Sequence, residues 1–221
     1  MKPTDKISVL ICVHSKDDNH DKLLGRALES LARQTFFDFE LIVVLDECWE
    51  YTKQQLFNYE NFFDLKYYER PHKQGLAVAK NFGLKHCTGD WVAFLDADDQ
   101  FIDCKLELQR NFLLENPSID FCGTQAWDLA NNRMTTNCFG INDYVTHDQI
   151  AKRIWQENVM CHGSMMIRKS ALDALNGYRT DKFLLGREDW DLWQRAFNAG
   201  FNFAKLPERL YIYSMGTSVE R

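Results

Sequence analysis

The stretch Trp91-Val92-Ala93-Phe94-Leu95-Asp96-Ala97-Asp98-Asp99 decides the fold of this 221-residue chain. Its first five residues are apolar, which predicts a strand buried on both faces, and three of its last four are acids. Further strands are predicted over residues 7–13, 40–45 and 65–69, with helices between them over 21–34, 52–63 and 75–86. Strands that alternate with helices predict an α/β fold with a mainly parallel sheet.

Beyond residue 100 the alternation becomes looser. We expect helices over 106–115, 149–156 and 188–199, the last closed by Gly200, and strands over 119–126 and 164–167. Residues 128–145 form a polar excursion without a clear pattern. Because no linker-like stretch divides the chain, we predict a single domain over 1–221.

Composition excludes several classes of protein. A formal net charge of −6 argues against a broad electrostatic grip on nucleic acid. The seven cysteines include no C-x-x-C pair and stand mostly in apolar stretches. They favour reduced, buried thiols in a cytoplasmic protein over a disulfide frame or zinc site. The N-terminus leads into only seven apolar residues, which predicts neither signal peptide nor membrane span, so any membrane contact would be peripheral.

Acidic residues close two of the predicted strands. Asp46 follows 40–45, and Asp96, Asp98 and Asp99 follow 91–95. In an open parallel sheet, ligands bind beyond the carboxyl ends of the strands. Neighbouring carboxylates repel unless a positive charge lies among them, and a divalent cation such as Mn²⁺ or Mg²⁺ would also hold a diphosphate. A solvated acidic turn is the alternative interpretation.

Four segments, in order, resemble the family-2 glycosyltransferases of GT-A fold. They are residues 7–13, 30–44, 75–99 and 178–193, the last containing Gly186-Arg187-Glu188-Asp189-Trp190-Asp191-Leu192-Trp193. The resemblance covers most of residues 7–213. It implies a nucleotide-sugar-binding half over 1–99 and an acceptor-binding half over 100–221. It also implies transfer of a sugar from a nucleotide-diphosphate donor, expected to be a UDP-sugar, to a hydroxyl of a glycan or lipid-linked acceptor.

The resemblance also implies roles for donor-binding residues. Asp46 matches the acid that contacts the nucleotide base, although Leu45-Asp46-Glu47-Cys48 stands where the family often has Asp-Asp-Gly-Ser. Lys80 is expected near the donor, with a solvated helix lysine as the alternative. Asp98 is expected to bind the metal, and Asp96 to bind the metal, the ribose or the donor sugar.

Asp189 matches the catalytic base of the family. One positioned carboxylate that deprotonates the acceptor hydroxyl is sufficient for direct displacement, which inverts the anomeric centre. Glu188 and His162 are expected near the acceptor or the diphosphate, and a satisfied core histidine is equally open for His162. Without the family, the acids at 188–191 are ordinary first-turn residues of a helix. Trp190 and Trp193 are expected to pack in the core.

One feature departs from the family pattern. Many relatives have a histidine after a C-terminal strand, whereas Tyr211-Ile212-Tyr213 is followed by Ser214-Met215-Gly216-Thr217-Ser218. Either this end of the site is built differently, or a segment outside this sequence completes it. We therefore expect an inverting glycosyltransferase of polysaccharide biosynthesis, located in the cytoplasm or at the inner face of the membrane. A non-catalytic domain of the same fold and a nucleotidyltransferase acting on sugar phosphates are the alternatives.

Overall fold

The first half of the chain is a parallel sheet between two helical layers. The structure is a computed structural model that describes residues 5–15, 17–130, 133–135 and 145–214. The parallel strands occur in the order β3-β2-β1-β4. Their bounds are β1 Ile7–Val13, β2 Phe39–Asp46, β3 Asp64–Arg70 and β4 Trp91–Phe94. The predicted strands are confirmed.

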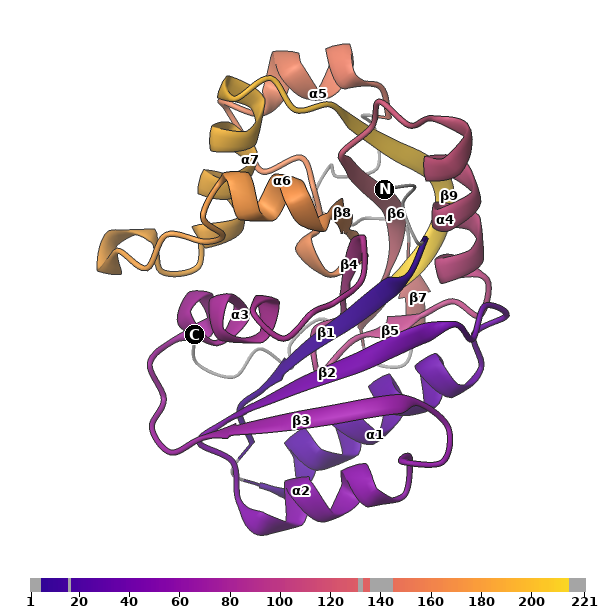
Figure 1. The fold of residues 1–221 in the computed structure, drawn as a ribbon, viewed down its shortest axis with the longest axis vertical. Coiled ribbons are helices and arrows are strands. Elements are labelled where there is room, and N and C mark those ends of the chain that lie inside the picture. Colours follow the sequence, from indigo (N-terminus) through magenta and orange to yellow (C-terminus); the bar gives the residue numbers. More distant parts are fainter. Residues whose placement is uncertain (1–4, 16, 131–132, 136–144, 215–221) are drawn as a thin grey trace.

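Alternate residues of the strands pack on opposite faces of this sheet. Helices α1 (Asp18–Ala32) and α2 (Glu50–Phe57) cover one face, and α3 (Leu76–Leu84) covers the other (Figure 1). Val9 and Ile11 of β1 belong to the same core as Leu24 and Leu28 of α1. Leu10, between them, packs in the second core. Both faces are therefore buried, which explains the continuous apolar runs.

The second half extends the sheet with mixed pairing. β8 pairs antiparallel with β4 and β6, β6 pairs parallel with β9, and β5 closes the edge. The strands are β5 Gln100–Phe101, β6 Phe121–Ala130, β7 Arg133–Thr135, β8 Met166–Arg168 and β9 Phe203–Ser214. The helices are α4 Lys105–Glu115, α5 His147–Arg153, α6 Lys169–Ala174 and α7 Glu188–Asn198, with 3₁₀ turns η2 His162–Ser164 and η3 Lys182–Leu184. The sheet is thus entirely parallel in its first half and mixed in its second.

Several predicted bounds were wrong. The helix predicted over 52–63 ends at Phe57, because Tyr59 and Phe63 stack on each other and Phe63 packs against Phe39 in β2. The polar excursion begins later than predicted, since β6 continues to Ala130 and β7 pairs with it; residues 131–132 and 136–144 lie outside the described part.

A buried carboxylate joins three strands at the amino-terminal edge of the parallel sheet. Glu40, at the start of β2, accepts hydrogen bonds from Ser8 Oγ at 2.6 Å and from the backbone N–H of Thr88 at 2.6 Å. The Thr88 hydroxyl and Lys66 Nζ add further bonds at 2.8 and 3.2 Å. Burial opposes ionisation here, but these donors outweigh it and lower the pKa of Glu40 to about 2.

The predictions on thiols and membrane spans can be compared with the structure within the described residues. The six cysteines of the described residues are free thiols, and Cys138 lies outside them. Among the helices of the described residues, none has both the length and the apolar character that crossing a bilayer requires.

Candidate active site

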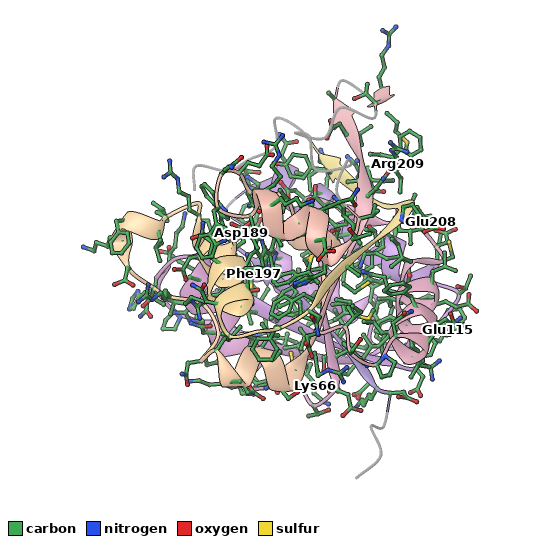
Figure 2. The ribbon with its side chains drawn as sticks, turned by 90° about the horizontal axis from the view of Figure 1, so that it is seen from above. Lys66, Glu115, Asp189, Phe197, Glu208 and Arg209 are labelled. Carbon is green, nitrogen blue, oxygen red and sulfur yellow. The ribbon has the colours of Figure 1, made fainter. Side chains whose placement is uncertain are left out.

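Two groups of acids, far apart in sequence, line one cavity of about 570 Å³. Asp96 and Asp98 follow β4, while Glu188 and Asp189 begin α7. Figure 2 shows Asp189 on the first turn of α7 and Phe197 near its other end. Lys80 of α3 and His162 of η2 line the same cavity. Thus six of the seven predicted site residues lie around one space.

The seventh residue, Asp46, lines an adjoining cavity of about 680 Å³. The two cavities share five lining residues, which are Cys12, Val13, His14, Leu76 and Glu188. Asp46 is buried at the end of β2, and Arg70 Nη1 lies 3.2 Å from its Oδ1. Burial raises the pKa of Asp46, while the guanidinium of Arg70 opposes that rise. The two cavities therefore adjoin each other at the carboxyl ends of the strands, where the topology places ligands.

Asp189 is held by two hydrogen bonds. Asn158 Nδ2 donates to its Oδ2 at 2.8 Å, and the backbone N–H of Trp190 donates to its Oδ1 at 2.7 Å. Burial in the cavity wall raises the pKa of Asp189, and Glu188 raises it further; Lys80 and the two donors oppose them. The net shift is upward, which favours a carboxylate that accepts a proton more readily than an exposed aspartate does.

Lys80 lies beside the two acids of α7. Its side chain is buried, and its Nζ lies 3.8 Å from Glu188 Oε1 and 5.4 Å from the centre of the Tyr178 ring. The alternative of a solvated helix lysine is therefore wrong. A buried cation at this point offsets the negative charge of Glu188 and Asp189 and leaves a positive group facing the cavity.

The acidic turn after β4 combines half-buried and buried carboxylates. Asp96 and Asp98 are half-buried in the cavity wall, whereas Asp99 is buried and accepts hydrogen bonds from the Tyr211 hydroxyl and the Ser214 N–H. Burial, then Asp98 and Asp96, raise the pKa of Asp99 well above its usual range. Asp99 thus ties the turn to β9, and all three acids of the turn line the cavity.

His162 satisfies both interpretations of the sequence. It is buried, and its Nε2 lies 2.7 Å from the Tyr178 hydroxyl, as in a core histidine. Its Nδ1 lies 4.0 Å from Asp96 Oδ1, and the residue lines the cavity. Both tryptophans pack in the core as predicted. Trp193 is fully buried, and the partly buried Trp190 packs against the same core.

The oxygen donors of the acidic turn fit a hard divalent cation. The described residues include no group of three His, Cys, Asp or Glu side chains that would hold an ion by themselves. Asp96 and Asp98 supply two carboxylates beside a cavity with room for a diphosphate. Mg²⁺ and similar ions are commonly bound by one or two carboxylates together with substrate phosphates, so this donor set suits such an ion.

Two residues that contact the predicted acids, Arg70 beside Asp46 and Asn158 beside Asp189, were not predicted. Arg70 is the register partner of Asp46 at the ends of adjacent strands, so the predicted β2 and β3 carried a signal for it. Asn158 stands in the loop between α5 and η2, and no spacing in the sequence points to it.

Comparison with known proteins identifies the family. Residues 8–175 match the family model described as glycosyl transferase family 2. The chain belongs to this family. Residues 144–217 also match a model described as the N-terminal domain of galactosyltransferase.

Two similar glycosyltransferases support this membership. The chain is 29% identical to the putative glycosyltransferase EpsE of Bacillus subtilis, over 96% of this chain and 73% of that protein. It is 29% identical to the O-antigen biosynthesis glycosyltransferase WbnJ of Escherichia coli, over 88% of this chain and 72% of that protein. The prediction of a family-2 glycosyltransferase is confirmed.

Solved structures confirm the fold. S. aureus TarS 1–349 in complex with UDP-GlcNAc has a TM-score of 0.79 at 22% identity, over 97% of this chain and 60% of that chain. The mannosyltransferase PcManGT from Pyrobaculum calidifontis, in complex with GDP-Man and Mn²⁺, has a TM-score of 0.74 at 17% identity, over 96% of this chain and 57% of that chain. The chain thus spans about 60% or less of these solved chains, and the predicted GT-A fold is confirmed.

Proposed function

We propose that this chain is an inverting, cation-dependent glycosyltransferase that uses a nucleotide-diphosphate sugar. The observation that carries the proposal is the single cavity lined by both Asp98 and Asp189. A UDP-linked donor is the first candidate, because the TarS complex contains UDP-GlcNAc. GDP-mannose belongs in the same test, since the mannosyltransferase complex contains it.

The donor would lie along the two adjoining cavities. Asp46, paired with Arg70, would face the nucleotide base, and Asp96 the ribose or the sugar. Asp98, with Asp96, would hold the divalent cation, which when bound offsets the charge of the leaving diphosphate. We assign residues 1–99 to donor binding and residues 100–221 to acceptor binding.

Asp189 would act as the base. Its carboxylate takes the proton of the acceptor hydroxyl while the hydroxyl oxygen bonds to the anomeric carbon. The bond from that carbon to the diphosphate oxygen breaks at the same time, and the electron pair leaves with the nucleoside diphosphate. Attack from the opposite face inverts the anomeric centre, so no enzyme nucleophile is needed. Lys80 helps to keep Asp189 charged, and Glu188 and His162 would contact the acceptor or the diphosphate.

We propose that the acceptor is a hydroxyl of a glycan or lipid-linked saccharide in polysaccharide biosynthesis. The relative WbnJ is named for O-antigen biosynthesis. WfgD of Escherichia coli, 26% identical over 65% of this chain and 55% of that protein, is named as a glucosyltransferase acting on GlcNAc-diphosphoundecaprenol. Such an acceptor would place this chain at the cytoplasmic face of a membrane.

A loop beside the donor cavity supports contact with a membrane. Phe183 and Leu185 are 77% and 66% exposed, and exposed Lys182 and Arg187 flank them. Apolar and basic side chains together suit an anionic lipid surface. In sedimentation with phosphatidylglycerol vesicles, Phe183→Ser/Leu185→Ser should reduce binding, whereas the control Phe62→Ser, at another exposed phenylalanine, should not. Equal binding by all three proteins would contradict the membrane contact.

A donor screen tests the enzymatic proposal. UDP-glucose, UDP-GlcNAc, UDP-galactose and GDP-mannose would be offered with Mn²⁺ or Mg²⁺, and melting temperature and nucleoside diphosphate release measured. One donor should stabilise the wild type only with metal, by about 2.7 kcal/mol at a hundredfold excess over Kd. Asp98→Ala should lose this response, and the exposed control Asp148→Ala should keep it. Equal responses of wild type and Asp98→Ala would overturn the site, and pyrophosphate release from a nucleoside triphosphate and a sugar phosphate would indicate a nucleotidyltransferase.

A further inference from the structure

Asn158 connects the cavity to the buried core beneath it. The residue lines the cavity, and its Nδ2 donates to Asp189 Oδ2 at 2.8 Å. On its other side, Asn158 Oδ1 accepts from Trp193 Nε1 at 3.1 Å and from the backbone N–H of Met160 at 3.4 Å. Both ends of this amide are therefore occupied, one by the carboxylate and the other by fixed donors.

The indole of Trp193 fixes which way the amide faces. An indole N–H can only donate, so the atom of Asn158 that faces it must be the oxygen. The amide nitrogen then has to face Asp189, where it meets an acceptor. Trp193 is 0% exposed and lies on α7, the same helix that carries Asp189. It cannot move without disturbing the core, which holds the amide in this orientation.

This arrangement restricts the Asp189 carboxylate at both oxygens. Asn158 holds Oδ2, and the backbone N–H of Trp190 holds Oδ1. A carboxylate has about four lone-pair sites, so two donors leave acceptor capacity for a further hydrogen bond. The donor from Asn158 also favours the charged form of a carboxylate that burial disfavours.

We propose that Asn158 is a positioning residue, which holds Asp189 in its reactive orientation and keeps it ionised through an amide fixed by Trp193. The inference rests on the proposed function, because it assumes that Asp189 is the base. The loop between α5 and η2 would thus contribute to catalysis without contacting the nucleotide-sugar donor.

Asn158→Ala and Trp193→Phe test the inference by two routes. Asn158→Ala removes the amide N–H that donates a hydrogen bond to Asp189. Trp193→Phe keeps an aromatic ring in the core but removes the indole N–H that orients the amide. We expect UDP release from UDP-GlcNAc with Mn²⁺, or from the donor that responds in the screen, to fall about 10- to 100-fold in kcat for Asn158→Ala. KM for the donor should change by less than about threefold, since the residue acts on the base.

The pH profile separates positioning from a structural role. Loss of the hydrogen bond to the charged form raises the pKa of Asp189, so the acid limb of kcat should move to higher pH in Asn158→Ala. Trp193→Phe should move it in the same direction by a smaller amount. Trp127→Phe, a control on β6 outside the cavity lining, should leave the limb in place. A merely structural role would lower the active fraction without moving the limb.

Three outcomes are decisive. If Asn158→Ala and Trp193→Phe keep the wild-type kcat and pH limb while Asp189→Asn loses turnover, the inference is overturned and the proposed function stands. If Asp189→Asn keeps turnover, the proposed function fails and the inference with it. If Asn158→Ala does not fold, the pH limb of Trp193→Phe decides.

Discussion

Glu40 is fully buried and Asp189 half-buried at opposite ends of the parallel strands, and their pKa values shift in opposite directions. Glu40 lies at the amino-terminal edge, where four hydrogen bonds from Ser8, Thr88 and Lys66 lower its pKa to about 2. Asp189 lies in the cavity at the other edge, where burial raises its pKa and two donors, Asn158 and the Trp190 N–H, oppose that rise.

The difference shows how one fold uses the same chemical group for two purposes. Around Glu40, four hydrogen bonds stabilise the charged carboxylate, which in turn stabilises the strands it joins. Around Asp189, two hydrogen bonds do not offset the effect of burial, so its pKa is raised and the carboxylate can gain a proton more readily. Perturbed carboxylates of the second kind concentrate at functional sites, and those of the first kind contribute to stability.

Asp189→Asn should give the largest effect. Removing the base is expected to lower turnover about 10²- to 10⁴-fold, with little change in melting temperature, because the amide keeps the shape of the carboxylate. The measurement is nucleoside diphosphate release together with a thermal melt. Asp191→Asn, two residues along the same helix, should stay within about threefold of the wild type. Similar losses in both variants would indicate a damaged helix and contradict the assignment of the base.

Glu40→Gln should lower stability and leave turnover unchanged, the opposite of Asp189→Asn. Its amide can accept fewer of the surrounding donors, so we expect a loss of about 2 kcal/mol in the free energy of unfolding. Turnover of the folded protein should be unchanged. Denaturant unfolding and specific activity check the two halves of the prediction. A variant that loses turnover but not stability would break the distinction between the two edges.

Lys80→Met tests whether the ammonium of Lys80 lowers the pKa of Asp189. The ammonium of Lys80 opposes the rise in the pKa of Asp189, so its removal should move the acid limb of kcat to higher pH and lower turnover about tenfold near neutral pH. A pH profile of nucleoside diphosphate release is the measurement. Lys85→Met, on the residue that caps the same helix, serves as the control. An unmoved acid limb in Lys80→Met would show that the cation does not act on the base.

The pH dependence of stability should show the smallest effect. The pKa of Glu40 is lowered on folding from 4.5 to about 2, so its stabilising contribution is complete above about pH 4.5 and disappears as pH falls toward 2. The difference in unfolding free energy between wild type and Glu40→Gln should therefore shrink over that window. A difference that stays constant from pH 6 to pH 2 would mean that the charge of Glu40 does not stabilise the fold.

Most of the parallel half of the fold was predictable because β1, β2 and β4 are buried on both faces and appear as apolar runs, whereas β3 is only partly buried. The acids at 46 and 96–98 were predictable as site residues for a related reason, since they stand directly after such runs. Their convergence with Asp189 came from the resemblance to the family, because nothing in the spacing of residues 98 and 189 places them in one cavity.

The mixed half was predicted less well for local reasons. β9 runs from Phe203 to Ser214, but Pro207-Glu208-Arg209 interrupts its apolar pattern, and the register with β6 shifts at Thr124 and Gln125 to accommodate the extra residues. The short helix α6 was not predicted. Asn158 gave no signal, because its role depends on a buried indole that only the folded chain brings to it.

Anomalous diffraction from a crystal with Mn²⁺ and the donor from the screen tests the central claim, that both acid groups serve one reaction in one cavity. We expect a manganese peak at about 2.2 Å from a carboxylate oxygen of Asp98, as metal–oxygen bonds require, with the anomeric carbon between the diphosphate and Asp189. A manganese ion bound away from Asp98, or a sugar that points away from Asp189, would contradict it.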